Sequence, residues 1–301
     1  MAWTPKGKTR APGSGSQMVT GGIAGNVTLP SITEVDGSSA RPSILASGGS
    51  GTGKTWGIEQ MLRGGKNILI GAVESKIQAL MAHNPKVIFF GAPIEDRATG
   101  AKRSPTASEV YQRLQMFKDR LGEGEFREHN GKPFDLIAID GLMEVGAVIH
   151  RHFRENTPIS KSTGERNTYA MADEIGVQTV DFVKGIRDAA SAASELYGIP
   201  PVGVYATCGE FAIEPKLGGD VQYKPALYGN VGPRNIPFAF EAVLHLEVDR
   251  DDEGRPRYLA HTAPNQPVFF AKAPAGLDPI LVNWNMNDVY DQIVTSYRGE
   301  A

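Results

Sequence analysis

Residues 48 to 55 place four glycines around a lysine and a threonine, in the order Gly-Gly-Ser-Gly-Thr-Gly-Lys-Thr. This octapeptide satisfies G-x-x-x-x-G-K-[ST], a pattern in which consecutive backbone amides surround a phosphate and a Cβ would obstruct their close approach. We expect the Lys54 ammonium to bind the β- and γ-phosphates and the Thr55 hydroxyl to bind Mg²⁺. The alternative is a plain glycine-rich turn. The pattern predicts a nucleotide-binding site, with a polyphosphate as ligand, at Gly48, Gly49, Ser50, Gly51, Thr52, Gly53, Lys54 and Thr55.

Two carboxylates are candidates for the remaining chemistry of such a site. The segment 134–140, FDLIAID, is a mostly apolar strand that ends at Asp140, as in a Walker B element, whose carboxylate holds Mg²⁺ through water. Hydrolysis also needs a residue that orients or deprotonates water, but Gly141 rather than a glutamate follows Asp140. Glu74 is the best candidate, because it ends the next apolar segment after the glycine-rich loop, and parallel strands bind ligands at their carboxyl ends. The alternatives are a turn or helix cap for Asp140 and a surface residue for Glu74.

The segments that must position these residues alternate between strand and helix patterns. Apolar runs predict buried strands, and the capping-box pair Thr106 and Glu109 predicts the start of a helix. This alternation predicts an α/β fold with a mostly parallel sheet and helices on both faces. The expected strands are 42–49, 66–75, 86–92, 134–140 and 200–208, and the expected helices are 53–63, 107–121 and 168–198.

The C-terminal third has a different pattern. Segments 240–249, 257–263 and 267–273 resemble strands, and their short connections predict antiparallel pairing. A helix is expected over 285–297. We therefore expect a flexible basic arm at 1–38, an ATPase domain at 39–275 and a helical tail at 276–301.

Composition narrows the class of protein. With 301 residues, 41% hydrophobic and 22% charged, the chain has the composition of a globular protein that can bury a large core. Its net charge of -3 does not favour a nucleic-acid binder, although a local basic surface remains compatible with that total. Cys208 is the only cysteine, and the sequence contains no long apolar run. These features predict a cytoplasmic protein with no disulfide and no membrane span.

The arrangement resembles the RecA-like ATPases. The resemblance rests on GGSGTGKT, on ILIGAVES with its glutamate at Glu74, and on LIAIDGL, a Walker B element without an adjacent glutamate. It spans roughly 41–275 and is strongest to compact phage-encoded nucleotide-binding proteins of recombination and single-strand annealing. The resemblance implies that Glu74 activates the attacking water, and, for a phage protein, that the host cytoplasm is the place of action.

The family comparison also implies partners. Family members bind single-stranded DNA through two loops, which correspond here to 150–166 and 209–235. They hydrolyse ATP between the subunits of a homo-oligomer, with a neighbour supplying a cation, for which Lys272 is the first candidate and Arg234 the alternative. Thr207 occupies the place of the γ-phosphate sensor, where many relatives have Gln or His, and this departure leaves its role open.

These observations predict a Mg²⁺-dependent ATPase that acts on single-stranded DNA in recombination or annealing. Two other classes remain open. A DNA-packaging or helicase-loading motor would use the same nucleotide site, as would a P-loop kinase. Stimulation of ATP turnover by single-stranded DNA favours the first class, and stimulation by a protein partner alone favours a motor or loader.

Overall fold

The structure is a computed structural model that describes residues 41–74, 77–96, 98–157, 168–214, 219–265 and 268–298, with the backbone alone at 168–170. The predicted arm at 1–38 lies outside these residues. So do Lys161 and Arg166 of the first predicted DNA loop and Lys216 of the second.

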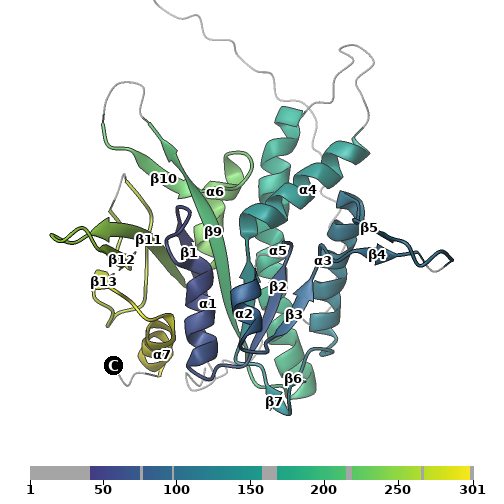
Figure 1. Ribbon diagram of the computed structural model, residues 1–301, viewed down its shortest axis with the longest axis horizontal. Coiled ribbons are helices and arrows are strands. Elements are labelled where there is room, and N and C mark those ends of the chain that lie inside the picture. Colours follow the sequence, from purple (N-terminus) through teal and green to yellow (C-terminus); the bar gives the residue numbers. More distant parts are fainter. Residues whose placement is uncertain are drawn as a thin grey trace, which may run out of the picture. The chain divides into compact units, whose positions relative to one another are not determined.

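A single large sheet forms the centre of the fold (Figure 1). Its strand order is β13-β12-β11-β1-β9-β8-β2-β3, with β10 added to β9. Every pairing from β3 across to β11 is parallel, and β12 and β13 extend the sheet antiparallel at its edge. The strands are β1 (Ser43–Gly48), β2 (Ile68–Ala72), β3 (Lys86–Phe89), β8 (Leu136–Asp140), β9 (Gly203–Ile213), β10 (Gln222–Pro225), β11 (Ala242–Arg250), β12 (Pro256–His261) and β13 (Ile280–Val282).

Helices cover both faces of this sheet, so alternate strand residues enter two separate cores. Ile44 and Ala46 of β1 pack with α1 (Lys54–Arg63), α2 (Gln78–Met81) and α7 (Met286–Tyr297). Leu45 packs with the opposite layer, formed by α3 (Ala107–Gly122), α4 (Leu142–Asn156) and α5 (Thr168–Tyr197). Burial on both faces explains why β1, β2 and β8 are apolar along their length. The predicted α/β fold, which the resemblance to RecA-like ATPases also implied, is confirmed.

The predicted capping box begins α3. The Thr106 side chain accepts a hydrogen bond from the Glu109 amide at 3.2 Å, and the Glu109 carboxylate accepts one from the Thr106 amide at 2.8 Å. Both bonds satisfy amides that the first turn of a helix leaves without a partner.

The prediction of an antiparallel C-terminal set was partly wrong. The predicted antiparallel pairing of 240–249 with 257–263 is confirmed, since β11 and β12 pair in that direction. The segment 267–273 does not supply the third strand, because its described residues 268–273 contribute only isolated antiparallel bridges, one of them between Val243 and Lys272. The reason lies at the edge of β11, where β12 occupies positions His245 to Arg250 and leaves only the start of the strand available. The third antiparallel strand is β13.

The two predicted DNA loops contain regular structure. Residues 150–156 form the last turns of α4, and β9 continues to Ile213 to form a hairpin with β10. The short helix α6 (Val231–Asn235) and a 3₁₀ turn, η2 (Ile236–Ala239), follow the hairpin. Two small hairpins, β4 (Ile94–Glu95) with β5 (Lys102–Arg103) and β6 (Glu128–His129) with β7 (Lys132–Pro133), lie outside the central sheet. Among the described residues, no helix has the length and apolar character to cross a membrane.

Candidate functional site

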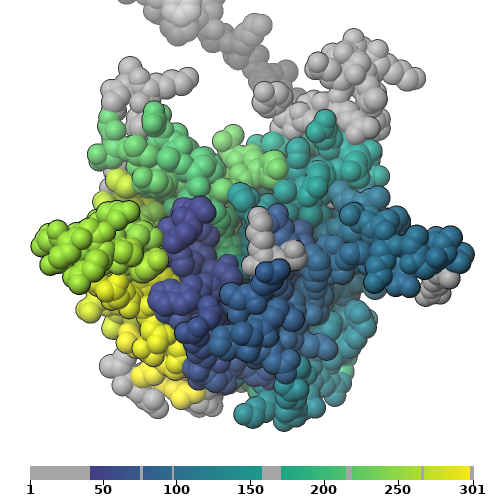
Figure 2. Space-filling model, viewed as in Figure 1, coloured from purple at the N-terminus to yellow at the C-terminus, as the bar shows by residue number. Residues whose placement is uncertain are grey.

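The glycine-rich loop connects β1 to α1 and lies at the surface, as the purple segment of Figure 2 shows. Gly51 and Gly53 have φ angles of 79° and 91°, in the left-handed region that favours glycine. A Cβ on Gly48 would lie 2.3 Å from the carbonyl oxygen of Leu246. At three of the four glycine positions, the backbone conformation or the space available therefore favours glycine over other residues. The Thr52 hydroxyl closes the loop by donating to the Gly49 carbonyl at 3.0 Å.

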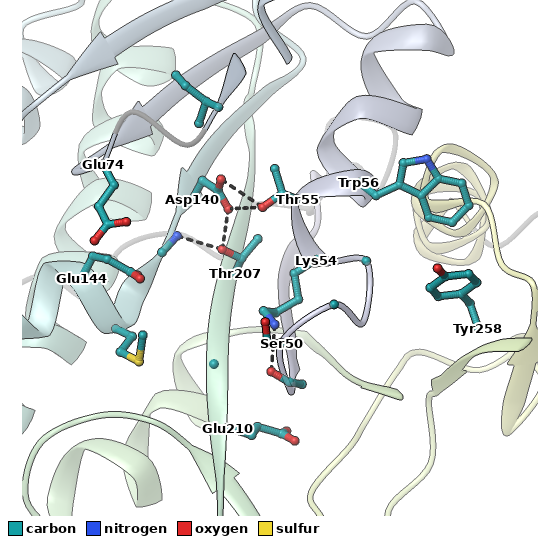
Figure 3. A pocket seen from close by; sticks show the side chains of 17 residues that line it. Ser50, Lys54, Thr55, Trp56, Glu74, Asp140, Glu144, Thr207, Glu210 and Tyr258 are labelled. Atoms are coloured by element: carbon teal, nitrogen blue, oxygen red, sulfur yellow. Dashed lines mark hydrogen bonds between the residues drawn. The ribbon is translucent and has the colours of Figure 1, made fainter. Parts of the chain in front are cut away.

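The carboxyl ends of β1 and β8 lie on either side of the middle of β9, next to this loop (Figure 3). The Thr55 hydroxyl lies 3.1 Å from both carboxylate oxygens of Asp140. β9 lies between β1 and β8, and its Thr207 hydroxyl donates to Asp140 at 2.7 Å while accepting the Gly141 amide at 2.8 Å. Thr207 is thus bonded to the Asp140 carboxylate and the backbone that follows it.

The Lys54 ammonium lies inside the loop, where it donates to the carbonyl oxygens of Gly48 and Gly49. Burial lowers the pKa of Lys54, and nearby acidic groups, including Asp140, oppose that shift. Burial raises the pKa of Asp140, although hydrogen bonds from Thr207 and Thr55 and the charge of Lys54 favour its ionised form. Two backbone carbonyls therefore hold the Lys54 ammonium, two hydroxyl groups hold the Asp140 carboxylate, and each charge stabilises the other within a partly desolvated site.

These residues line a cavity of about 840 Å³. Glu74, exposed after the end of β2, lies at its edge, as predicted from the strand pattern. Among the described residues, the charged side chains of the lining are one cation and four carboxylates, namely Lys54, Glu74, Asp140, Glu144 and Glu210. Against these side chains a polyphosphate faces more negative than positive charge, so added cations favour its binding.

Two of these carboxylates, Glu144 and Glu210, were not anticipated from the sequence. Glu144 lies in the first turn of α4, directly after the Asp140 strand, and Figure 3 shows it on the same side of Asp140 as Glu74. Its position in the helix that begins at the end of β8 was a signal that could have been used. Glu210 lies three residues beyond Thr207 on β9.

Glu210 of β9 holds the carboxyl end of β1 through side-chain hydrogen bonds. Its buried carboxylate accepts a hydrogen bond from the Ser47 hydroxyl at 2.7 Å, and His245 Nδ1 lies 3.0 Å away. Ser47 directly precedes Gly48, so this group joins β1, β9 and β11 at the entry to the glycine-rich loop. The side chains of Trp56 and Tyr258, also not anticipated, line another part of the cavity.

Lys272 and Arg234 do not line this cavity. The Lys272 ammonium lies 6.0 Å from the Phe238 ring centroid, and burial lowers its pKa. Their predicted role is in a neighbouring subunit's site, so it stays a prediction. Burial raises the pKa of Cys208 to about 12, so this thiol is neutral and a poor nucleophile.

The two segments predicted to bind DNA are in contact. The ring of His150, near the end of α4, stacks on that of Tyr228 at a centroid distance of 4.5 Å. Phe211 and Tyr223 lie on the β9–β10 hairpin with 38% and 39% of their surface exposed. Aromatic side chains at this exposure are available for stacking with unpaired bases.

No family model and no curated protein matches this chain. Solved structures do match it. One of them, a crystal structure of the RadB recombinase, is 12% identical, covers 80% of this chain and 87% of that chain, and has a TM-score of 0.36. At that similarity the function of this chain has to be inferred from the geometry of its own site.

Proposed function

We propose that this protein binds Mg²⁺·ATP at the glycine-rich loop and hydrolyses it. The observation that carries the proposal is the contact between the Thr55 hydroxyl and the Asp140 carboxylate beside the Lys54 ammonium. A hydroxyl at the start of α1 and a carboxylate at the end of β8 are the groups that a nucleotide-bound magnesium ion requires at these places.

The donor set fits magnesium. Thr55 and Asp140 supply hard oxygen atoms, and Mg²⁺ in nucleotide sites commonly takes only one or two protein ligands beside phosphates and water. The described lining residues carry more carboxylates than cations, so a divalent cation favours the binding of a triphosphate. Bound there, the ion would neutralise charge on the β- and γ-phosphates.

The chain's own groups account for the remaining steps. Backbone amides of residues 49–55 and the Lys54 ammonium hold the phosphates and stabilise the charge that develops during transfer. We assign to Glu74 the orientation of the attacking water and the acceptance of its proton. The water oxygen bonds to the γ-phosphorus while the bond to the β–γ bridging oxygen breaks, so the products are ADP and inorganic phosphate.

The proposed biological role is action on single-stranded DNA in recombination or annealing, in an oligomer with Lys272 or Arg234 near a neighbour's nucleotide, in a phage context. Support comes from the contact between His150 and Tyr228, which brings the two predicted DNA segments together, and from the exposed aromatic residues of the hairpin. Stacking on aromatic rings binds unpaired bases without sequence preference.

An ATPase assay of wild type, Lys54→Ala, Glu74→Gln and Glu144→Gln tests the enzyme assignment. We expect Lys54→Ala to lose nucleotide binding, and Glu74→Gln to retain binding while its turnover falls by about 10²–10⁴-fold, the usual contribution of a general base. Glu144→Gln removes the same charge from the same cavity and is the matched control. Equal loss in both glutamine variants would indicate a general charge effect and contradict the role of Glu74.

The same assay with single-stranded DNA tests the role. Stimulation that weakens as salt rises supports contact with the DNA backbone. An ATP turnover rate that does not change with DNA but rises with a protein partner would instead favour a motor or loader.

A further inference from the structure

Two aromatic side chains form one end of the nucleotide cavity. Trp56 directly follows Thr55 in the first turn of α1, and Tyr258 lies on β12. Their ring centroids are 5.7 Å apart, and Trp56 is 39% exposed. The ring centroid of the buried Trp284 also lies 5.7 Å from that of Trp56. We call Trp56 and Tyr258 the aromatic wall. Trp284, which does not line the cavity, holds the Trp56 indole in place.

The two ends of the cavity differ in chemistry. Figure 3 shows Trp56 and Tyr258 on one side of Lys54 and Thr55, with Glu74 and Glu144 on the other. A nucleotide with its phosphates on the loop can direct its base to only one of these ends. A base presents a π-face that stacks favourably on aromatic rings, whereas a carboxylate offers it no such surface.

Within the nucleotide cavity, the aromatic end has few groups that could distinguish one base from another. Among the described residues that line this cavity, there is no Asn, Gln or Arg, the side chains that pair with base edges in two-point contacts.

A separate, smaller cavity shares Trp56 and is lined by Gln60, Arg63, Asn285 and Asn287, but there Arg63 pairs with Glu59, and Asn287 donates to Asp291. Gln60, on the same helix as Trp56, uses its amide nitrogen to donate to the Trp284 carbonyl and its amide oxygen to accept from the Met286 amide. Both ends of this amide are therefore already bonded to the backbone.

We propose that the aromatic wall binds the nucleobase by stacking, and that the site takes adenine and guanine nucleotides with similar affinity. This inference rests on the proposed nucleotide site and specifies its substrate class. Stacking contributes binding energy for any base because every base has a π-face, and purines offer the larger one.

Calorimetric Kd values for ATP, GTP and inorganic tripolyphosphate, each with Mg²⁺, test this. For wild type we expect ATP and GTP to differ by less than about fivefold, a difference of about 1 kcal/mol. Trp56→Ala should weaken both by about 5- to 150-fold, the range for loss of one base–aromatic stack, and leave tripolyphosphate binding unchanged. Trp56→Phe keeps an aromatic face and should retain most of the affinity for both nucleotides. Thermal denaturation of each variant verifies that it is folded.

Several outcomes overturn the assignment. If Trp56→Ala binds ATP with wild-type affinity, the base does not stack on Trp56. If Trp56→Ala loses affinity for ATP and for tripolyphosphate equally, the substitution acts by disturbing the structure of the glycine-rich loop. A difference between the ATP and GTP affinities beyond about fivefold, in either direction, removes the claim of similar affinity. If Lys54→Ala binds tripolyphosphate as wild type does, or wild type binds neither nucleotide nor tripolyphosphate, the proposed function itself fails.

Discussion

The hydroxyl of Thr55 lies 3.1 Å from each carboxylate oxygen of Asp140, although 85 residues separate the two positions in the chain. The contact joins the first turn of α1 to the end of β8, and Thr207 bonds the same carboxylate from β9. One helix and two strands of the parallel sheet are therefore held together at one carboxylate, and the proposed magnesium position lies within that group.

Removal of the Thr55 hydroxyl tests this relationship. Thr55→Val keeps the shape of the side chain but removes its oxygen, so we expect Mg²⁺ to strengthen ATP binding far less than in wild type. The loss should be about 10- to 150-fold, corresponding to ~1.5–3 kcal/mol for a hydrogen bond or ligand contact to a charged group. The measurement is the ratio of Kd values with Mg²⁺ and with a chelator. Thr55→Ser retains the hydroxyl and is the matched control; if it loses the Mg²⁺ effect too, the methyl group rather than the oxygen is needed.

The substitution Asp140→Asn distinguishes the effect of the buried Asp140 charge on folding stability from its proposed role in Mg²⁺ binding. Burial raises the pKa of Asp140, so its ionised form opposes folding above that pKa, and this cost vanishes as pH falls toward the ordinary value of 3.8. In buffer free of nucleotide and metal, the variant should melt at a higher temperature than wild type at about pH 7, and the difference should shrink toward about pH 4.

When Mg²⁺ and ATP are added, Asp140→Asn should show no Mg²⁺-dependent ATP binding at either pH. A melting temperature below that of wild type at neutral pH would mean that the hydrogen bonds from Thr55 and Thr207 outweigh the effect of burial.

The capping box of α3 gives a change in stability without a change at the site. Thr106→Ala removes the side-chain oxygen that accepts the Glu109 amide, which should cost about 1 kcal/mol of unfolding free energy and about 2–4 °C of melting temperature. ATP affinity should not change, because Thr106 does not line the cavity. Ser104→Ala, which alters an exposed hydroxyl ahead of the helix, should leave the melting temperature as it was. Equal melting of wild type and Thr106→Ala would show that the cap contributes nothing.

Local sequence patterns were sufficient to predict the elements whose structure is determined by a few adjacent residues. The glycine spacing, the apolar strand ending at Asp140 and the Thr106–Glu109 pair each specify an element and its end. The rule that parallel strands share one carboxyl edge then predicts that residues at those ends come together. The proximity of Thr55, Asp140 and Glu74 could be predicted in this way.

Pairing between distant segments could not be predicted. The sequence of β11 is compatible with either strand direction, and only its place beside β1 makes it parallel. Glu210 resembles a surface residue until Ser47 and His245 are placed against it, and Tyr258 resembles an ordinary strand residue until Trp56 is near. Such contacts depend on tertiary packing, which the spacing of residues along one segment does not encode.

The first two glycines of the loop should differ sharply in their tolerance of alanine. A Cβ on Gly48 would lie 2.3 Å from the Leu246 carbonyl oxygen and 2.7 Å from the Thr52 hydroxyl, and the first of these atoms belongs to the backbone of a central strand. A Cβ on Gly49 would meet only a methyl group of Thr52 at 3.9 Å. Gly48→Ala should therefore lower stability by about 1–3 kcal/mol through overpacking and displace the loop from β11, weakening ATP binding.

Gly49→Ala should keep both stability and affinity close to those of wild type, which chemical denaturation and calorimetry can measure side by side. The predicted sensitivity of Gly48 depends on the pairing of β11 with β1, which the sequence patterns did not indicate. A stable, ATP-binding Gly48→Ala protein would mean that β11 does not lie against the entry to the loop.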